Sequence, residues 1–322
     1  MSGLSIVALD ALQLNDLDWS ALEALGDVTR YDGTAPDQVP ARAGDADVLL
    51  VNKVKLPESV LSQLPKLKYV GVLATGYDNV DTAAAARRNI AVTNVPGYSS
   101  DSVAQLTFAL LLELCHHAGE HSRRVLEEKA WSRQPYYCFW DFPLSELVGR
   151  TMGVVGLGRI GVRVAEIARA FGMNVIAYTR TPKEIAGVKC VDFDTLLAES
   201  DVISLNCPLT EQTRGLINAD ALARMKKTAY LINTSRGGVI VEDDLRRALD
   251  AGMIAGAAVD VLSSEPPTED NPLLHAKNII VTPHIAWASR IARQRVIERA
   301  AANITGWFSG QPQNVVNGVL PR

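Results

Sequence analysis

One stretch in the middle of the chain limits what this sequence can fold into. It is Val154-Val155-Gly156-Leu157-Gly158-Arg159-Ile160-Gly161, and the apolar run Met152 to Val155 at its start predicts a buried strand. Residues Val162 to Phe171 follow, with apolar side chains at helical spacing. A strand, a G-x-G-x-x-G turn and a helix in this order open a dinucleotide-binding βαβ unit, so the stretch predicts a bound dinucleotide.

The three glycines have separate physical roles in such a unit. Gly156 permits the tight turn, Gly158 lets the backbone approach a pyrophosphate, and Gly161 lets the helix pack closely on the strand. The helix N-terminus adds unpaired N–H groups and a partial positive charge for the phosphates. The alternative is a tight turn between strand and helix that binds nothing.

Composition excludes several classes of protein. A chain of 322 residues suggests two domains, and a net charge of -4 with dispersed basic residues argues against nucleic acid or an anionic membrane as the main partner. The four cysteines form no C-x-x-C pair, so we expect neither a disulfide framework nor a metal site. Residues Met1 to Asp10 lack the features of a signal peptide, and no apolar span is long enough for a transmembrane helix. We expect a cytoplasmic protein.

The glycine motif begins about 150 residues into the chain, so a separate domain precedes it. In that first part we expect four strands, at Leu4–Leu9, Val48–Val51, Tyr69–Leu73 and Ile90–Thr93. Between them we expect helices at Trp19–Leu25, Glu58–Leu64 and Thr82–Arg88. After the motif we expect strands at Asn174–Tyr178, Val188–Val191, Val202–Asn206, Ala229–Asn233, Gly256–Val259 and Ile279–Val281. Alternation of this kind predicts parallel α/β sheets. A last helix, Arg290 to Phe308, should return to the first domain.

Two strand ends in the first part carry unusual residues. Val51 is followed by Asn52-Lys53, and Leu73 is followed by Ala74-Thr75-Gly76-Tyr77-Asp78. Ligands of open α/β sheets sit beyond the carboxyl ends of strands, and a loop with glycine can present backbone N–H groups to an anion such as a carboxylate. The alternative is an ordinary turn between strand and helix.

Between the two parts, Asp101 to Ala118 predicts a long helix capped by Ser99 or Ser100. Thr107 on this helix is a candidate cofactor contact. The stretch Glu120 to Pro143 holds two of the five tryptophans and the cluster Tyr136-Tyr137-Cys138-Phe139-Trp140. Such an arm either buries its aromatic residues against a second subunit or packs them on its own domain.

Polar residues recur at the carboxyl ends of the strands that follow the glycine motif, as a cofactor crevice requires. We therefore expect the cofactor to contact the three glycines of the motif and a further set of residues. That set is Thr107, Arg159, Ile160, Arg180, Cys207, Pro208, Thr213, Thr234, Ser235 and Asp260.

Three residues of this second part suggest chemistry. Arg236 follows a strand, and its guanidinium suits bidentate binding of a carboxylate. His284 lies just beyond a strand that we expect to be buried, and histidine is the usual general acid/base near neutral pH. Glu265 lies in a loop, and a carboxylate bonded to an imidazole orients it and favours its protonated form. Singly, each residue also fits a structural role: a surface Arg, a capping His and a solvated Glu.

In combination the motifs resemble those of the D-isomer-specific 2-hydroxyacid dehydrogenases over almost the full chain. The matching pieces are Ala74 to Asp78, Ser102 to Thr107, Gly156 to Gly161, Asn233 to Gly238 and Thr282 to His284. Within that family, His284 to Trp287 and Trp131 to Leu147 are similar to glycerate dehydrogenases, which are hydroxypyruvate reductases.

The resemblance implies two Rossmann-like, doubly wound parallel-sheet α/β domains, with the cofactor domain inserted into the substrate (catalytic) domain. Residues 1–100 and 288–322 would form the substrate domain, and residues 101–287 the dinucleotide-binding domain. The implied reaction is hydride transfer between NAD(P)H and C2 of a small 2-oxo or 2-hydroxy acid: hydroxypyruvate/D-glycerate, and also glyoxylate. Together with the aromatic arm, the resemblance also implies a homodimer.

The resemblance assigns catalysis to Arg236, Glu265 and His284. His284 would donate a proton to the ketone oxygen with support from Glu265, while Arg236 binds the carboxylate and the ketone. The backbone of Ala74, Thr75 and Gly76 would complete the carboxylate site, and Lys53 would contact the distal hydroxyl. Asp260 would hold the nicotinamide carboxamide.

One place departs from the family's NAD-specific members, which end the second strand of the motif with an acidic residue for the ribose hydroxyls. Here that place holds Tyr178-Thr179-Arg180-Thr181, with no carboxylate. A cation flanked by two hydroxyls suits a 2′-phosphate, which favours NADP, although Arg180 stacking on adenine in an NAD enzyme is the alternative. A different functional class also stays open: dinucleotide-sensing corepressors resemble this family and keep the three catalytic residues.

Overall fold

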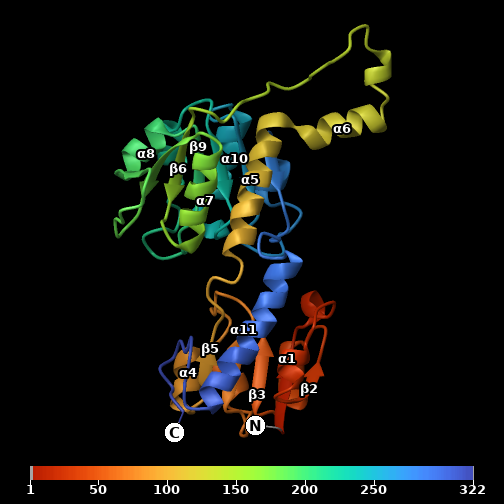
Figure 1. Ribbon diagram of the computed structural model, residues 1–322, viewed down its shortest axis with the longest axis vertical. Coiled ribbons are helices and arrows are strands. Elements are labelled where there is room, and N and C mark those ends of the chain that lie inside the picture. The colour runs from red at the N-terminus through yellow and green to blue at the C-terminus, as the bar shows by residue number, and fades with distance from the viewer. Residues whose placement is uncertain (1–2, 322) are drawn as a thin grey trace. The chain divides into compact units, whose positions relative to one another are not determined.

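The computed structural model describes residues Gly3 to Pro321, which divide into two compact units. Unit 1 combines the N-terminal part of the chain, up to Ser99, with the C-terminal part from Ala288. Unit 2 is continuous from Ser100 to Trp287. Each unit contains one parallel sheet covered by helices, so the predicted fold class is confirmed (Figure 1).

The sheet of unit 1 has five parallel strands. In spatial order they are β2 (Gly26–Arg30), β1 (Leu4–Ala8), β3 (Val48–Val51), β4 (Tyr69–Val72) and β5 (Ala91–Thr93). The four strands predicted here are confirmed to within one residue at each end. β2 was missed because it is an edge strand in which Val28 is the one large apolar residue, so it lacks the apolar run that marked the others.

Helices cover both faces of this sheet. They are α1 (Ser20–Glu23), α2 (Val39–Ala43), α3 (Glu58–Leu61), α4 (Thr82–Arg87) and α11 (Arg290–Phe308), with 3-10 turns η1 (Leu12–Leu14) and η2 (Pro36–Gln38). Apolar residues of α2, α3 and α4 form one core with the sheet. On the other face α11 packs on β4, where the rings of Trp307 and Tyr69 lie 5.7 Å apart. The last helix therefore returns to unit 1, as predicted.

The strand order of unit 1 reverses between β1 and β3. From β1 the chain first adds β2 on one side and then β3, β4 and β5 on the other. In doubly wound sheets this reversal leaves a crevice beyond the carboxyl ends of the two central strands, and ligands bind there. In unit 1 that position is occupied by residues that follow Ala8 and Val51.

The sheet of unit 2 has seven parallel strands. In spatial order they are β12 (Ile279–Val281), β11 (Gly256–Val259), β10 (Tyr230–Asn233), β9 (Val202–Leu205), β6 (Thr151–Val155), β7 (Asn174–Tyr178) and β8 (Val188–Cys190). The order reverses between β6 and β9. All the strands predicted here are confirmed, but β12 is a half-buried edge strand rather than a buried one, because it has a neighbour on one side only.

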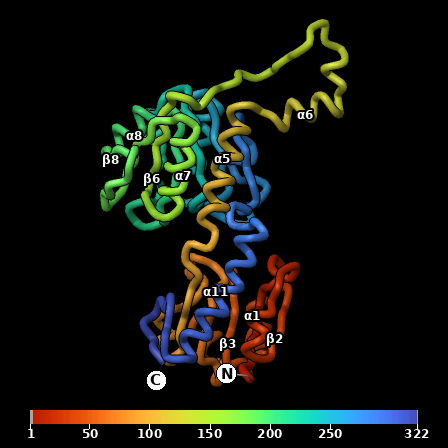
Figure 2. The backbone as a smooth tube through the Cα atoms, viewed as in Figure 1, coloured from red at the N-terminus to blue at the C-terminus, as the bar shows by residue number. Residues whose placement is uncertain are grey.

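Helices also cover both faces of the second sheet. They are α5 (Ser100–His116), α7 (Arg159–Ala170), α8 (Phe193–Glu199), α9 (Ala219–Arg224) and α10 (Glu242–Asp250), with 3-10 turns η4 (Gly237–Val239) and η5 (Pro272–His275). Unit 2 also contains α6 (Ala118–Leu126) and the 3-10 turn η3 (Trp131–Arg133), which do not cover the sheet. Along β6, Met152 and Val154 join the core under α5 and α7, while Val155 joins the core under α8, α9 and α10. Figure 2 shows β6 between α7 and α8. Among residues 3–321, no helix is long and apolar enough to cross a membrane.

α5 ends two residues before the predicted boundary. His117 adopts a left-handed conformation, with φ of 48°, and α6 begins directly after it. We call residues 118–144 the arm. In Figures 1 and 2, α6 and the extended segment after it project from the rest of unit 2.

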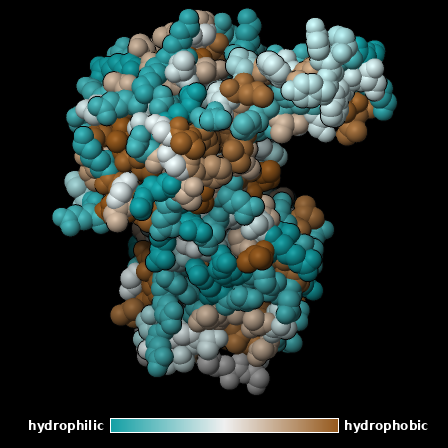
Figure 3. Space-filling model, turned by 45° about the horizontal axis from the view of Figure 1, so that its top comes forward, coloured by the Kyte–Doolittle hydropathy of each residue, from teal (hydrophilic) through white to brown (hydrophobic). Residues whose placement is uncertain are grey.

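Aromatic residues of the arm are exposed in the single chain. The exposed fraction is 52% for Trp131, 75% for Tyr136, 88% for Tyr137 and 65% for Trp140. In the space-filling view the arm is mostly pale, with brown residues among them (Figure 3). Of the two alternatives for these aromatics, packing on their own domain is therefore wrong for these four residues.

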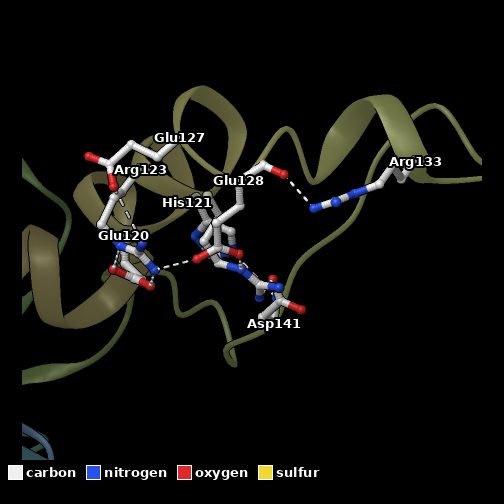
Figure 4. Close-up of polar contacts among 8 residues, drawn as sticks. Glu120, His121, Arg123, Glu127, Glu128, Arg133 and Asp141 are labelled. Atoms are coloured by element: carbon white, nitrogen blue, oxygen red, sulfur yellow. Dashed lines mark hydrogen bonds and ion pairs between the residues drawn. The ribbon is translucent and has the colours of Figure 1, made fainter.

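Ion pairs hold the arm in shape. The Arg123 guanidinium lies 2.7 Å from both the Glu120 and the Glu128 carboxylates, and Arg124 pairs with Asp141 (Figure 4). Hydrogen bonding to Arg123 lowers the pKa of the Glu120 and Glu128 carboxyls. The pair between Arg124 and Asp141 joins α6 to the segment that returns toward the sheet. Polar contacts thus stabilise the arm and leave its aromatic residues for another surface.

Gly161 and Gly158 provide a matched test of packing in unit 2. A Cβ on Gly161 would lie 1.9 Å from the Gly156 carbonyl oxygen, whereas a Cβ on Gly158 meets no atom within 4 Å. We expect Gly161→Ala to lower the free energy of unfolding by about 1–3 kcal/mol, the usual cost of overpacking. Gly158→Ala should change it by less than about 0.5 kcal/mol. Urea unfolding followed by circular dichroism measures both, and equal effects would contradict the close approach of α7 to β6.

Candidate active site

The carboxyl ends of β6, β7 and β9 meet at the reversal point of the second sheet. The Gly156 amide donates to the Tyr178 carbonyl at 2.8 Å, and the Asn206 amide donates to the Val155 carbonyl at 2.8 Å. Gly156 has φ of 95°, and a Cβ there would lie 2.8 Å from the Asn206 carbonyl oxygen. Both the backbone conformation and the close approach therefore require glycine at this turn.

The turn after Gly156 has the features of a dinucleotide site. Gly158 caps α7, and the space beside its Cα is open. The first N–H groups of a helix have no carbonyl partner within it, so those of Arg159 and Ile160 are available to a phosphate. The side-chain oxygen of Asn206 is buried beside this turn without a hydrogen-bond partner among the described residues, and it can accept from a ligand. The residues present thus fit the pyrophosphate of a dinucleotide.

The loop after β7 is cationic. Arg180 is exposed, and the Lys183 ammonium donates to the Leu157 carbonyl of the glycine turn at 3.3 Å. The carboxylate of Asp192 lines a hollow with Thr179, but it already accepts the backbone amide and the hydroxyl of Thr195, each at 2.7 Å. The loop therefore presents positive charge beside the glycine turn, while the neighbouring carboxylate caps α8.

Other expected cofactor residues lie on α5 and in the segments that follow β9 and β10. Thr107 is fully buried, donates to the Val103 carbonyl at 2.9 Å and lies 3.1 Å from the Thr234 hydroxyl. Cys207 is buried, which raises the pKa of its thiol, and the Pro208 carbonyl accepts from the Thr213 hydroxyl at 2.6 Å. The contacts of these residues with a cofactor stay predictions.

Glu265 and His284 lie together. The Glu265 Oε2 and His284 Nδ1 atoms are 2.5 Å apart, and the two side chains are 33% and 28% exposed. The contact agrees with the partnership that the residue types suggested and the resemblance implied. Because Nδ1 is engaged by the carboxylate, Nε2 is the ring atom that a ligand can use.

Arg236 lies on a turn that packs against the Glu265 loop. The Asn233 side chain donates to the Arg236 carbonyl at 2.9 Å and accepts from the Ser235 amide at 3.0 Å, which fixes the turn. A Cβ on Gly237 would lie 1.9 Å from the Leu262 carbonyl carbon, so the turn and the start of the Glu265 loop are in close contact. The exposed Arg236 guanidinium donates to the Ser235 carbonyl at 2.8 Å.

Asp260 holds the loop that carries His284. Its carboxylate is 1% exposed and accepts from the Thr282 hydroxyl at 2.6 Å and from the Ile285 and Ala286 amides at 2.9 and 2.8 Å. From the sequence, Asp260 was expected to bind the nicotinamide carboxamide, and its role in holding this loop was missed. That contact stays a prediction, and two partners on Oδ1 and one on Oδ2 leave acceptor capacity on the carboxylate.

Glu242 of α10 is a further residue that sequence reasoning missed. Its carboxylate accepts from the Ser263 amide at 2.6 Å and from the Asn271 side chain at 2.8 Å. These two hydrogen bonds tie the Glu265 loop to α10. The sequence does not predict this role, because Glu242 lies 21 residues before Ser263 and an acidic residue is common at the start of a helix.

Unit 1 carries a separate group of candidate ligands after β4. The Thr75 hydroxyl donates to the Val95 carbonyl at 3.1 Å, and the Asn94 side chain donates to the Thr75 carbonyl at 2.7 Å. Within residues 3–321 no acceptor is assigned to the N–H groups of Thr75 and Gly76, so both are available to an anion. Lys53, after β3, is exposed. In the same described range, no group of three or more His, Cys, Asp or Glu residues could hold a metal ion.

Comparison with known proteins identifies the family. Residues 108–286 match the NAD-binding domain of the D-isomer specific 2-hydroxyacid dehydrogenases. The chain is 47% identical over 322 residues to a hydroxypyruvate reductase of Blautia hydrogenotrophica, covering 98% of this chain and 100% of that one. It is 38% identical over 289 residues to a glycerate dehydrogenase of Methylorubrum extorquens, covering 89% and 90%.

A solved structure agrees over the whole chain. It is that of an NADPH-dependent glyoxylate/hydroxypyruvate reductase of Sinorhizobium meliloti in complex with NADP and malonate. It is 31% identical, with a TM-score of 0.84, and the match covers 99% of this chain and 98% of that one. The chain belongs to the family of D-isomer-specific 2-hydroxyacid dehydrogenases.

Proposed function

We propose that this enzyme reduces hydroxypyruvate to D-glycerate, and also reduces glyoxylate, with NAD(P)H. The observation that carries the proposal is the pair of Glu265 and His284 beside the Arg236 turn, on neighbouring strands of a dinucleotide-binding sheet. The printed names of the relatives support the substrate class, since they include hydroxypyruvate, glycerate and glyoxylate.

His284, Glu265 and Arg236 each have a separate role in the proposed reduction. A bound nicotinamide supplies the hydride to C2 of the 2-oxo acid. His284 Nε2 donates the proton to the ketone oxygen, so the carbonyl becomes an alcohol and the imidazolium becomes neutral. Glu265 stabilises the imidazolium, and Arg236 binds the carboxylate and polarises the ketone.

Unit 1 contributes recognition in this proposal. The free N–H groups of Thr75 and Gly76, with the Ala74 backbone, bind the substrate carboxylate. Lys53 donates to the hydroxyl on C3 of hydroxypyruvate.

The alternative of a dinucleotide-sensing corepressor is tested by turnover. The wild-type chain should consume NADH or NADPH in the presence of hydroxypyruvate or glyoxylate, measured by the absorbance of the reduced nicotinamide. Absence of turnover with every pair, while dinucleotide still binds, would favour a sensor. A cytoplasmic location and the lack of nucleic-acid or membrane partners stay predictions.

His284→Asn tests the proton donor. Asparagine can form hydrogen bonds but cannot donate a proton to a ketone at neutral pH, so kcat should fall by about 10²–10⁴-fold. Binding of the dinucleotide, measured by calorimetry, should persist. The matched control is His275→Asn, since His275 is a histidine of the same unit whose ring is hydrogen-bonded to the Glu269 carbonyl and not to Glu265. Retention of kcat in His284→Asn would end the assignment.

Glu265→Gln tests whether this carboxylate acts through His284. We expect kcat to fall by about tenfold or more, because a hydrogen bond to a charged group is lost from the imidazolium. In the His284→Asn background the same change should have little further effect, since residues that act as a unit are not additive. Additive losses in the double variant would show that Glu265 has a separate role.

Cofactor choice is the finer part of the proposal, and we propose a preference for NADPH. Arg180 can pair with a 2′-phosphate, Lys183 adds positive charge nearby, and residues 179–183 contain no carboxylate to bind the ribose diol. Arg180→Ala should lower the ratio of kcat/KM for NADPH to that for NADH by about one to two decades. Arg246→Ala, at a residue of α10 that pairs with Asp250, is the control. A wild-type ratio that favours NADH and does not change in Arg180→Ala would refute this role.

The arm suggests the assembly, and we propose that it joins two copies of the chain. Contact with a second copy would bury the exposed aromatic residues of the arm, a residue class that is enriched at protein interfaces. These residues are Trp131, Tyr136, Tyr137 and Trp140. Light scattering should give a dimer for the wild type and a monomer for Tyr137→Ser with Trp140→Ser. Leu12→Ser, at an exposed apolar residue outside the arm, should remain dimeric. A dimer that survives the arm substitutions would contradict the proposal.

A further inference from the structure

We propose that Asp10 is a positioning residue that fixes the Lys53 loop, and that it thereby gives the enzyme its recognition of 2-oxo acids with a hydroxyl on C3. The inference rests on the proposed function, because it needs Lys53 to contact the substrate. It assigns Asp10 no contact with the substrate or with the reacting atoms. We call residues 52–54 the Lys53 loop.

The topology places these residues at the ligand-binding edge of the first sheet. Asp10 lies two residues after the end of β1, and the Lys53 loop directly follows β3. β1 and β3 are the neighbouring strands between which the strand order of unit 1 reverses. Side chains at such a reversal point line the ligand crevice of doubly wound sheets.

The Asp10 carboxylate accepts hydrogen bonds from all three backbone N–H groups of the Lys53 loop. Oδ1 accepts from the Asn52 amide at 2.8 Å, and Oδ2 accepts from the amides of Val54, at 2.9 Å, and of Lys53. Three consecutive N–H groups thus point at one carboxylate. A loop held at three successive residues has little freedom, so the direction in which Lys53 leaves the backbone is set by Asp10.

The environment of Asp10 shows that this arrangement has a cost. Burial raises the pKa of the Asp10 carboxyl, although the three N–H groups and the Lys53 charge act in the opposite direction. Burying a carboxylate costs free energy unless hydrogen bonds compensate for the lost hydration. The three backbone hydrogen bonds compensate for it, and what they fix is the loop that carries Lys53.

A second contact ties the same loop to the carboxylate-binding loop. The Asn79 side chain donates to the Val54 carbonyl at 2.9 Å, and the Leu56 amide donates to the Asn79 carbonyl at 2.7 Å. Asn79 lies three residues after Gly76 on the loop that follows β4. The Lys53 loop is therefore fixed between Asp10 and the segment that offers the free N–H groups of Thr75 and Gly76.

Two fixed loops, one with Lys53 and one with Thr75 and Gly76, suit a substrate that has two separate polar groups to recognise. Hydroxypyruvate and glyoxylate share a carboxylate and a carbonyl, and only hydroxypyruvate has a hydroxyl on C3. A carboxylate held at Thr75 and Gly76 leaves the C3 hydroxyl as the group for the Lys53 ammonium. Loss of loop position should then weaken hydroxypyruvate binding and leave glyoxylate binding nearly unchanged.

Asp10→Asn is the test. An asparagine has one acceptor oxygen and one NH₂ group, so in either orientation the NH₂ faces at least one backbone N–H of the loop. We expect KM for hydroxypyruvate to rise about tenfold, the factor that corresponds to the loss of about one charged hydrogen bond. KM for glyoxylate should change less than about twofold, and kcat for either substrate should be affected less than KM for hydroxypyruvate. In the Lys53→Met background, Asp10→Asn should add nothing to the KM for hydroxypyruvate.

Asp47→Asn is the matched control. Asp47 lies at the other end of the same strand pair, where its carboxylate accepts from the Ser5 amide at 3.1 Å and pairs with Lys68. It tests the loss of a similar carboxylate from the same sheet, away from the ligand-binding edge. Its KM values should match those of the wild type.

Two results would overturn the role of Asp10: an equal rise of KM for both substrates, or an effect that persists in the Lys53→Met background. If Asp10→Asn does not fold, Asn79→Ala provides the second variant, and it should raise KM for hydroxypyruvate more than KM for glyoxylate, since it removes the hydrogen bond to the Lys53 loop but also lies on the loop of Thr75 and Gly76. Equal KM changes for both substrates in Asn79→Ala would again contradict the inference. A wild-type protein that turns over neither substrate would instead contradict the proposed function.

Discussion

The buried carboxylate of Asp260 is the interaction on which the His284 loop of unit 2 depends. It is 1% exposed and accepts three hydrogen bonds, all from residues of the loop that carries His284. Such a carboxylate is stable in the interior only while its partners satisfy it. Because two of these partners are the amides directly after His284, the Asp260 side chain and the backbone of His284 form one rigid assembly.

A carboxylate that accepts hydrogen bonds from a neighbouring loop also occurs in unit 1. Asp10 follows β1 and accepts three amides of the loop after β3, as Asp260 follows β11 and accepts partners from the loop after β12. In both units a carboxylate at one strand end fixes the loop after the neighbouring strand. Parallel sheets make this possible, because all carboxyl ends lie at one edge and a short side chain reaches the next loop. Two loops that carry proposed substrate contacts are thus held by carboxylate acceptors, in addition to the apolar packing of residues such as Val54 and Ala286.

Sequence reasoning identified the strands, and the polar residues at their carboxyl ends, for a physical reason. Buried parallel strands are short continuous apolar runs, such as Val48–Val51, and polar residues directly after such runs must lie at the ligand edge. β2 was missed because edge strands need not be apolar, and the start of α6 was missed because the left-handed His117 leaves no pattern. Acceptors such as Glu242 were missed for another reason. Their hydrogen-bond partners depend on which strands become neighbours in the sheet, and the sequence does not show that Glu242 will lie beside Ser263, 21 residues later.

The backbone of His284 shows what these acceptors achieve. Its φ of 54° is left-handed, a conformation that costs a non-glycine residue about 1–3 kcal/mol unless the surroundings enforce it. A glycine would remove the strain, but it would also remove the imidazole. The His284 amide donates to the Asp260 carbonyl at 2.9 Å, the next two amides donate to the Asp260 carboxylate, and the ring is bonded to Glu265. Four contacts therefore fix one strained residue, so that its free ring nitrogen has a defined direction before any substrate binds, and this preorganisation is what a proton donor requires.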